Sequence, residues 1–368
     1  MEFNQPIIPG MLSLGITTLK FVPLSKFDKP LQPHCLPASI TYLAFGASFK
    51  QPLQSDDLPS SLTTLEFAGN RPVKPNTIYA VMPTCYPDGL RTMIFGEYFT
   101  LIINPGDLPS SLTTLSFETY IWQYDGFIPS GVTSLKIGSP FSGSLNTLPS
   151  GLTSLTLGGM SDHQLEHLPA GIKYLDLGGS FHGPISPGTL PTGLTTLILG
   201  DRFSDPLVIG TIPSSVTSLE FGLPFRSPIP HGALPSGLLH LTLPLDEVPL
   251  KQFKSIFPTS LLPLHDTLLN SLTFKMMSFT FSILFDGYGD GDHGTCIRLE
   301  QVYQVINVIQ HWENMVHLSE IATYPVNKNT SIKLNCRQLD DDHILALNSF
   351  NRFIIIPINC RHHKTRHV

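Results

Sequence analysis

Apolar and polar residues follow a ten-residue pattern that recurs along the first two thirds of the chain. The pattern spans Leu58 to Phe67, with the sequence Leu-Pro-Ser-Ser-Leu-Thr-Thr-Leu-Glu-Phe, and it returns almost unchanged from Leu108 to Phe117. Its last four residues alternate between polar and apolar, which is typical of a β-strand because successive side chains of a strand point to opposite faces. We therefore predict one strand in each copy, and the recurrence indicates a repeat protein.

The spacing of the copies predicts the architecture. Successive anchors from residue 108 onward lie 20 or 22 residues apart. One strand in every ~22 residues is typical of leucine-rich repeats, whereas a propeller blade needs ~40 residues. The better copies begin at Leu36, Leu58, Leu108, Ile128, Leu148, Leu168, Leu190, Ile212 and Leu234. Poorer copies at Leu12 and Tyr86, with eroded ones after Leu243, bring the total to roughly eleven or twelve.

The part of each repeat that follows the strand has a second pattern. Residues 181–185, 203–207 and 225–229 each begin with Phe and carry Pro three residues later. Pro in so short a return excludes an α-helix, so the convex side is predicted to consist of loops or short extended segments. The predicted fold is a mainly β solenoid, a leucine-rich-repeat-like right-handed superhelix of ~22-residue repeats whose strands form a parallel sheet.

Two elements recur in phase over residues 1–243: the segment Phe-x-x-Pro-Ile, seen first from Phe3 to Ile7, and the strand pattern Leu-Pro-x-x-Leu-Thr-x-Leu. In these elements the chain resembles the FNIP repeat family of social amoebae, some of their relatives and giant viruses. It departs from that pattern at residues 71–81 and 118–125. The resemblance implies a leucine-rich-repeat-like solenoid, beside which family members sometimes carry a kinase or F-box domain. Since kinase motifs are absent and the repeats begin at the first residues, we expect neither domain here.

The pattern is lost in the C-terminal quarter of the chain. Residues 284–292 are acidic and rich in glycine, which predicts a flexible joint, and residues 297–321 carry apolar side chains at the spacing of an amphipathic helix. Residues 331–336 and 353–358 have the pattern of strands. Because the open end of a solenoid must be covered, we expect a solenoid over residues 1–275 and a small α+β cap over residues 276–368. A separate small binding domain is the alternative for this segment.

Composition and charge exclude several classes of partner. Charged residues make up 14% of the chain and the formal net charge is -6. The chain therefore has no basic field, and neither nucleic acid nor a membrane surface is expected as a partner. The five cysteines contain no Cys-x-x-Cys pair, which indicates reduced thiols and a cytoplasmic protein. We find no signal peptide, and no apolar run approaches the ~20 residues of a membrane helix.

Three segments carry residues that metal sites use, and in each the setting argues against a site. His163 to His167 matches the H-x-x-E-H motif of zinc peptidases, but it lies in a return too short for the helix that this motif needs. Residues 286–297 imitate a calcium loop, yet Tyr288 and Ile297 replace two ligands. The tail at 360–367 is basic and rich in His, and such termini are usually disordered. We predict no catalytic residue, metal or cofactor, and a zinc-dependent hydrolase is the weakest alternative.

The outward side chains of the predicted sheet, on its concave face, are the remaining candidates for function. They are rich in Ser and Thr, which keep an exposed sheet soluble. The larger or charged members are the candidate partner-binding residues: Tyr42, Glu66, Ile94, Tyr174, Asp176, Ile198 and His240. Because Tyr is enriched at interface hot spots, we predict a non-enzymatic module that binds a protein on this face. The alternatives are a substrate-recognition adaptor for a ubiquitin ligase and a repeat protein without a tight partner.

Overall fold

The computed structural model describes most of residues 3–244 and five later segments. The described residues are 3–69, 85–98, 103–118, 126–138, 145–158, 165–222, 225, 227, 229–230, 232–244, 271–275, 280–285, 331–340, 343–348 and 353–357. By its internal contacts the chain divides into two compact units, Met1–Gly183 and Pro184–Val368, called unit 1 and unit 2 below.

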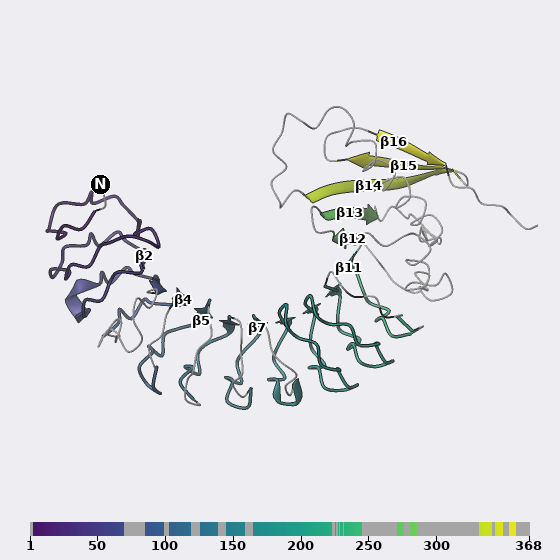
Figure 1. The fold of residues 1–368 in the computed structure, drawn as a ribbon, viewed down its shortest axis with the longest axis horizontal. Coiled ribbons are helices and arrows are strands. Elements are labelled where there is room, and N and C mark those ends of the chain that lie inside the picture. The colour runs from purple at the N-terminus through teal and green to yellow at the C-terminus, as the bar shows by residue number, and fades with distance from the viewer. Residues whose placement is uncertain are drawn as a thin grey trace, which may run out of the picture. The chain divides into compact units, whose positions relative to one another are not determined.

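Unit 1 is a stack of coils in which each coil contributes one strand to a parallel sheet (Figure 1). Its described strands are β1 (Thr18–Lys20), β2 (Tyr42–Phe45), β3 (Thr64–Gly69), β4 (Thr92–Tyr98), β5 (Thr114–Phe117), β6 (Ser134–Ile137), β7 (Ser154–Leu157) and β8 (Tyr174–Asp176). The register sets equivalent residues of the repeat side by side, so that Leu43 lies beside Leu65 and Leu65 beside Met93. This is the leucine-rich-repeat-like solenoid that the spacing predicts.

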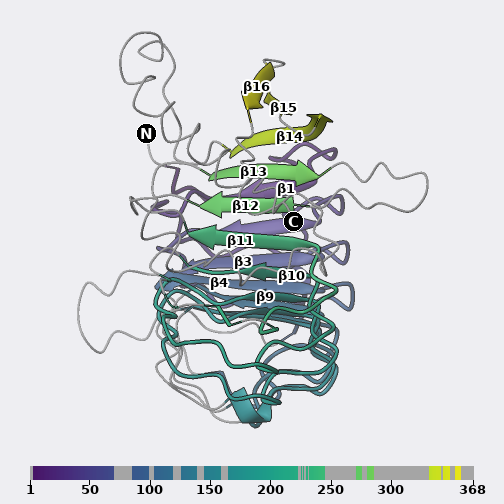
Figure 2. The same ribbon diagram turned by 90° about the vertical axis from the view of Figure 1, so that its right-hand side faces the viewer.

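Unit 2 continues the repeat and then changes its strand pattern. Strands β9 (Thr196–Ile198), β10 (Ser218–Glu220), β11 (His240–Pro244) and β12 (Ser271–Lys275) pair in parallel. Strand β13 (Thr280–Phe285) then runs antiparallel to β12, as the arrows in Figure 2 show. The parallel pairing of β12 with β11 is the pairing expected if residues 268–274 contain an eroded copy of the repeat.

The last three strands of unit 2 lie in the predicted C-terminal segment. They are β14 (Ser331–Asp340), parallel to β13, β15 (His343–Asn348), antiparallel to β14, and β16 (Phe353–Pro357), antiparallel to β15. Strand β14 covers the first run that the sequence predicts as extended, residues 331–336, and β16 covers residues 353–357 of the second, 353–358. The expected helix at 297–321, the calcium-loop-like segment from residue 286 and the tail at 360–367 lie outside the described residues. The division into residues 1–275 and 276–368 stays a prediction.

A Pro, usually in a Leu-Pro step, opens a tight turn before the strand in most coils of the solenoid. The carbonyl of Pro59 accepts the N–H of Leu62 at 3.0 Å, and the carbonyl of Pro109 accepts that of Leu112 at 3.2 Å. Pro suits this place because its φ is already near the value that the turn needs and it has no N–H to leave unpaired. The turn therefore aims the apolar residue that follows it, such as Leu62 or Leu112, into the core just before the strand.

The hydroxyl groups of the repeat join consecutive coils. The Ser61 hydroxyl donates to the carbonyl of Ile40 at 2.6 Å, and the Thr63 hydroxyl donates to the carbonyl of Thr41 at 3.0 Å. The same Ser bond recurs between Ser215 and Leu194 at 2.6 Å. These bonds link the side chains of one coil to backbone carbonyls of the coil before it, which explains why Ser and Thr recur at fixed places.

Phenylalanine rings form a column through the core of unit 1. The ring centroids are 6.1 Å apart for Phe21–Phe45, 5.8 Å for Phe45–Phe67, 6.0 Å for Phe67–Phe95 and 4.9 Å for Phe95–Phe117. Rings repeated on neighbouring strands of a parallel sheet are held close to the strand spacing of ~4.8 Å, which suits stacked aromatic pairs. The core is therefore continuous from one coil to the next.

The return half of the coil packs behind this column of rings. Hydrogen bonds also join consecutive returns to one another. The Phe49 ring lies 3.9 Å from that of Phe45. In the first two returns the residue after the Phe links to the next coil, since Asn4 Oδ1 accepts the N–H of Asp28 at 3.1 Å and Asp28 Oδ1 accepts that of Lys50 at 2.9 Å. In the described residues the returns contain turns and two 3₁₀ helices, η1 (Ser55–Asp57) and η2 (Leu165–His167). The described returns contain no α-helix, as the Pro positions predict.

One serine of the hydroxyl ladder has lost its acceptor. Ser111 occupies the place of Ser61, but Arg91 Nη1 donates to the carbonyl of Leu90 at 3.1 Å, on the coil where the acceptor is expected. The Ser111 hydroxyl oxygen is buried and has no hydrogen-bond partner among the described residues. A buried hydroxyl without a partner costs about 1–3 kcal/mol.

We expect Ser111→Ala to raise the free energy of unfolding by about 1 kcal/mol, because it removes this unpaired hydroxyl. Ser61→Ala should lower it by about 1 kcal/mol, because it removes a bond that is made. Urea unfolding of the two variants beside the wild type measures both effects. If both substitutions changed the free energy of unfolding in the same direction, the proposed difference between the unpaired Ser111 and the hydrogen-bonded Ser61 would be contradicted.

Candidate partner-binding face

Two columns of side chains form the outward face of the parallel sheet. In β3, Thr64 and Glu66 are partly exposed on this face, whereas Leu65 and Phe67 are buried beneath it. The same alternation holds in β5 and β7, because the pleat of a strand sends successive side chains to opposite sides. The constant register makes each column continuous within a unit. This is the face that the sequence predicts to bind a partner.

Near the start of unit 1, the outward side chains of Lys20, Tyr42 and Glu66 contact one another around the small residue Ala44. Ala44 lies between Lys20 and Glu66 in the register and is 1% exposed, although it points outward. The Tyr42 hydroxyl donates to the Glu66 carboxylate. The Lys20 ammonium lies 3.5 Å from Glu66 Oε2 and 5.9 Å from the centroid of the Tyr42 ring. The sequence suggests Tyr42 as a partner-binding residue because it is large. In the structure its side chain also makes a contact within the chain, the hydrogen bond to Glu66.

This arrangement changes the acidity of Tyr42. Burial, the hydrogen bond to Glu66 and the negative charge of Glu66 together raise the pKa of Tyr42 to about 12. The folded-state pKa therefore lies above the ordinary value of about 10, so folding favours the protonated phenol. The stabilisation that this shift reports is fully present below pH 10 and is lost as the pH rises through 12.

We expect a tyrosine signal that titrates near pH 12 in the folded chain and is missing in Tyr42→Phe. Glu66→Gln should lower the pKa of Tyr42, because the amide keeps an acceptor but removes the charge. An NMR titration of the tyrosine ring carbons, with the Tyr42→Phe spectrum as the assignment control, measures both. A Tyr42 signal that titrates near pH 10 would show that the Tyr42–Glu66 contact does not form.

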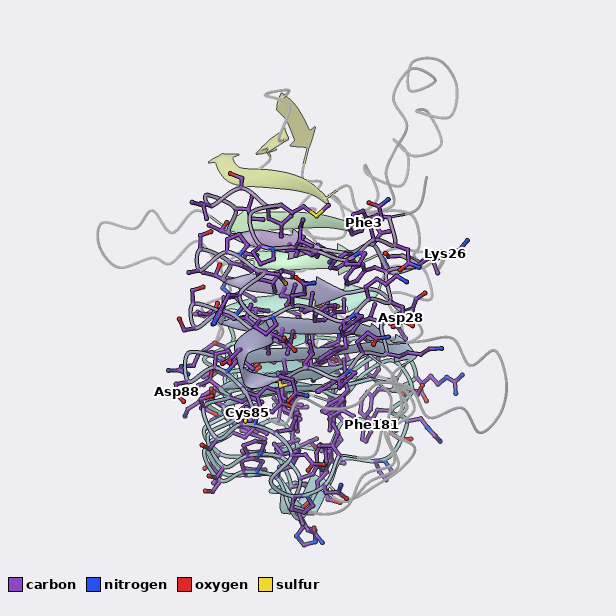
Figure 3. All side chains as sticks on the ribbon, turned by 90° about the vertical axis from the view of Figure 1, so that its left-hand side faces the viewer. Phe3, Lys26, Asp28, Cys85, Asp88 and Phe181 are labelled. Atoms are coloured by element: carbon purple, nitrogen blue, oxygen red, sulfur yellow. The ribbon has the colours of Figure 1, made fainter. Side chains whose placement is uncertain are left out.

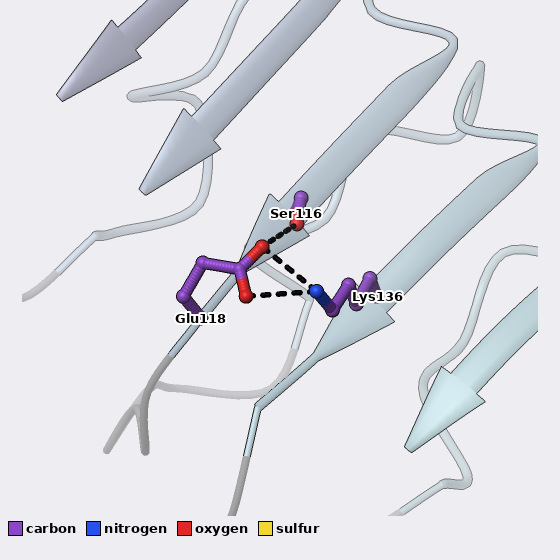
Figure 4. A network of polar contacts seen from close by, with 3 residues as sticks. All are labelled: Ser116, Glu118 and Lys136. Carbon is purple, nitrogen blue, oxygen red and sulfur yellow. Dashed lines mark hydrogen bonds and ion pairs between the residues drawn. The ribbon is translucent and has the colours of Figure 1, made fainter. Parts of the chain in front are cut away.

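A second pair of opposite charges lies further along the same face. The Lys136 ammonium on β6 lies 2.7 Å from Glu118 Oε2 and 2.9 Å from Glu118 Oε1, and the Ser116 hydroxyl donates to Glu118 Oε1 at 3.2 Å (Figure 4). Both charged side chains are well exposed, so the pair is worth at most about 1 kcal/mol. Glu118 follows β5 directly and falls outside the two columns, which is why the sequence pattern does not select it.

The other predicted residues are distributed over both units. Ile94 lies between Glu66 and Ser116 in the register and is partly buried. Tyr174 and Asp176 share β8, where Asp176 Oδ1 accepts the N–H of Gly178 at 2.9 Å. The structure thus brings Tyr42, Glu66 and Ile94 together on three adjacent strands.

In unit 2, Ile198 on β9 and His240 on β11 are separated by the intervening β10. Ile198 is partly buried and His240 is exposed. The two candidates of this unit therefore do not lie on adjacent strands.

The zinc-peptidase motif does not have the structural setting that its chemistry needs. His163 lies outside the described residues, and His167 is the exposed last residue of the three-residue η2. The motif requires an α-helix that turns both imidazoles to one metal. Across the described part of the chain, no group of three or more His, Cys, Asp and Glu side chains is placed to hold a metal ion. Nor is any described helix long and apolar enough to cross a membrane.

A comparison with protein families identifies the repeat. The model of the FNIP Repeat matches residues 27–70, 82–120, 162–202 and 203–246. The chain carries FNIP repeats. Each matched segment contains two consecutive strands, for example β2 and β3 in the first and β10 and β11 in the last. One FNIP repeat therefore corresponds to two coils of the structure.

Two solved structures are similar to the FNIP solenoid. CroV588, described as a novel circular leucine-rich-repeat protein, is 26% identical with a TM-score of 0.44, and the match covers 67% of this chain and 42% of that one. YopM from Yersinia enterocolitica is 18% identical with a TM-score of 0.34, over 59% of this chain and 55% of that one. The chain thus spans about half the length of these proteins or less. No curated protein matches it. Leucine-rich-repeat-like solenoids are typically interaction modules, because stacked repeats create extended binding surfaces.

Proposed function

We propose that the FNIP solenoid is a non-enzymatic module that binds another protein on the outward face of its parallel strands. The observation that supports this proposal is the constant register, which lays outward side chains of successive strands in continuous columns. Within unit 1 half of the residues in these columns are Ser or Thr, and Ile94 and Tyr174 interrupt them with large side chains. Aromatic and apolar anchors among small polar contacts are the usual composition of a protein interface.

The charges of this face indicate what kind of partner fits it. Lys20 pairs with Glu66, Lys136 pairs with Glu118, and Asp176 accepts the N–H of Gly178. The charged outward side chains of unit 1 are thus engaged within the chain. A partner that supplies apolar groups and neutral hydrogen-bond donors and acceptors fits such a face better than a highly charged one. Its affinity should depend only weakly on salt, because salt screens charge pairs and not apolar contacts.

The neighbouring strands suggest substitutions that the fold already accommodates. Ile94 lies beside Ser116, and Tyr174 lies beside Ser154. The double variant Ile94→Ser/Tyr174→Ser therefore installs at each place the residue of the adjacent coil. Val208→Ser, at an exposed loop position of unit 2, is the matched control that also replaces a large apolar side chain by Ser.

We expect affinity purification of the tagged chain from its own cells to recover a partner that the double variant loses and the control keeps. Truncation of a hot-spot side chain costs about 2 kcal/mol or more, so the measured affinity should fall at least ~10-fold. Equal binding by all three proteins would exclude this face. Ubiquitin-ligase subunits among the captured proteins would instead support the adaptor hypothesis.

A further inference from the structure

The loop that follows β1 is two residues longer than its equivalents in other coils. Five residues, 22–26, join Phe21 to Phe27, whereas three residues join Phe45 to Phe49. The equivalent loops of two later coils are also three residues long: 178–180 and 200–202. The rings at the two ends are nevertheless in contact in both cases, with centroids 4.3 Å apart for Phe21–Phe27 and 3.9 Å for Phe45–Phe49. Because the ends of the longer loop are held close together, its two extra residues project from the coil.

Backbone contacts hold this projecting loop in place. The N–H of Ser25 donates to the carbonyl of Val22 at 2.8 Å, and the carbonyl of Pro23 accepts the N–H of Ala47 on the next coil at 2.8 Å. A Cβ on Gly46 would lie 2.7 Å from the carbonyl oxygen of Val22, so the loop also touches the next coil closely. The loop is therefore a fixed part of the surface of unit 1.

Two large apolar side chains of the loop are turned to solvent. Val22 is 66% exposed and Leu24 is 78% exposed. The equivalent loops at 46–48, 178–180 and 200–202 consist of Gly, Ala, Ser, Asp and Arg, so Val22 and Leu24 do not stand at core positions of the repeat. Exposed apolar side chains gathered in one place commonly mark an interaction site.

Lysines accompany these apolar side chains. Lys26 belongs to the loop, Lys29 follows it, and Lys50 follows Phe49 in the return of the next coil. Lys26 and Lys50 are exposed and Lys29 is partly exposed. The Lys26 side chain points away from the coil, as Figure 3 shows. The loop therefore combines an apolar tip with a basic base.

The local charge at this loop has the opposite sign to that of the whole chain. Residues 3–55 contain four lysines and one acidic residue, Asp28, which gives a formal charge of +3, whereas the whole chain carries -6. Asp28 Oδ1 accepts the backbone N–H of Lys50 at 2.9 Å and Gln51 Nε2 at 2.8 Å. The net charge of the chain thus conceals a positive region around the loop.

We propose that the loop at 22–26 docks onto a membrane surface that contains anionic lipid. Val22 and Leu24 enter the boundary between headgroups and acyl chains, and the lysines contact the anionic headgroups. Apolar side chains beside lysines are the composition of segments that lie in a membrane interface, and anionic lipids attract each lysine. Protein interfaces, in contrast, are depleted of lysine. The site lies beyond the end of β1, outside the two outward columns, so it does not rest on the proposed protein-binding function.

The test uses the full-length chain and vesicles of defined composition. We expect the chain to sediment with vesicles of phosphatidylcholine and phosphatidylserine at low salt, and to stay in solution with vesicles of phosphatidylcholine alone. Added salt should release it, because salt screens the attraction between lysines and headgroups. A wild-type chain that does not bind the phosphatidylserine vesicles would overturn the proposal.

Variants of the loop then assign the binding to its residues. Val22→Ser/Leu24→Ser should weaken vesicle binding at least ~10-fold, because it removes the apolar area that enters the membrane. Lys26→Gln/Lys29→Gln should weaken it at least ~10-fold, because it removes two charges near the lipid surface. Circular dichroism verifies that the variants fold. Vesicle binding that either double variant retains in full would overturn the proposal.

The matched control replaces an apolar pair that has no lysine beside it. Val208 and Ile209 are 55% and 64% exposed, and in their loop Asp201 and Asp205 outnumber Arg202. Val208→Ser/Ile209→Ser should therefore bind vesicles as the wild type does. A loss of binding as large as that of Val22→Ser/Leu24→Ser would show that the loop at 22–26 is not the site.

A fluorescent reporter locates the contact. We expect the added fluorescence of Leu24→Trp to be quenched by vesicles whose acyl chains are brominated, and that of Val208→Trp to be unaffected. Leu24→Trp fluorescence that these lipids leave unchanged would overturn the proposal. So would capture of a protein through Leu24 by a chain that does not bind vesicles, which would assign the loop to a protein interface instead.

Discussion

Gly222→Ala is expected to lower the free energy of unfolding by about 3 kcal/mol, through overpacking against a neighbouring backbone. A Cβ at this position would overlap the carbonyl oxygen of Gly200 and the Cα of Asp201 on the previous coil. Backbone atoms cannot rotate away as a side chain does, so the two coils would have to separate. That would disturb the packing of the Phe203 and Phe225 rings, whose centroids are 6.0 Å apart.

Gly237→Ala is the matched control for this substitution. A Cβ at Gly237 would lie 3.7 Å from the carbonyl oxygen of Ser214, which is ordinary van der Waals contact. Alanine there should be neutral or stabilising by about 0.4–1 kcal/mol, because it restricts the unfolded chain. Urea unfolding of both variants separates the two effects. If both substitutions leave the midpoint unchanged, the coils are not in close contact at Gly222.

Leu65→Ala is expected to lower the free energy of unfolding by about 2–5 kcal/mol. Leu65 is completely buried on β3, with Leu43 and Met93 beside it on the neighbouring strands. Its truncation leaves a cavity shared by three coils, and the parallel ladder on both sides prevents the core from collapsing into it. Chemical denaturation measures the loss as a lower midpoint with little change of slope.

Ile209→Ala removes a similar volume from an exposed position and serves as the control. Ile209 is 64% exposed, so its truncation should change the free energy of unfolding by less than about 0.5 kcal/mol. A loss at Leu65 no larger than that at Ile209 would mean that the repeat Leu is not the centre of the core.

The repeat also shows how the FNIP sequence pattern serves the solenoid. The apolar residues of the pattern fill the core, as the stacked rings of Phe45 and Phe67 do. Its polar residues bond to a neighbouring coil: the Ser61 hydroxyl donates to the coil before it, and the Asp28 carboxylate accepts from the coil after it. A single substitution therefore acts on two coils at once, which is why both large predicted effects involve contacts between coils.

The fold of this protein is largely determined by its sequence pattern alone. The period, the strand in each coil, the inward direction of Leu65 and Phe67 and the lack of an α-helix in the described returns all follow from alternation and Pro placement within ~22 residues. A solenoid makes this inference possible, because each coil contacts only its neighbours and equivalent residues stack. The sequence pattern of one repeat therefore determines which residues of neighbouring coils contact each other.

Only the tertiary structure decided how the outward residues are used. The sequence suggests Tyr42 and Glu66 because of their size and charge, but their hydrogen bond and the contact with Lys20 join residues that are far apart along the chain. The loss of the Ser111 acceptor to Arg91 and the close approach at Gly222 likewise depend on side-chain conformation and coil spacing. Periodicity determines which residues are neighbours, whereas distances and hydrogen bonds between those neighbours arise only once the coils are packed.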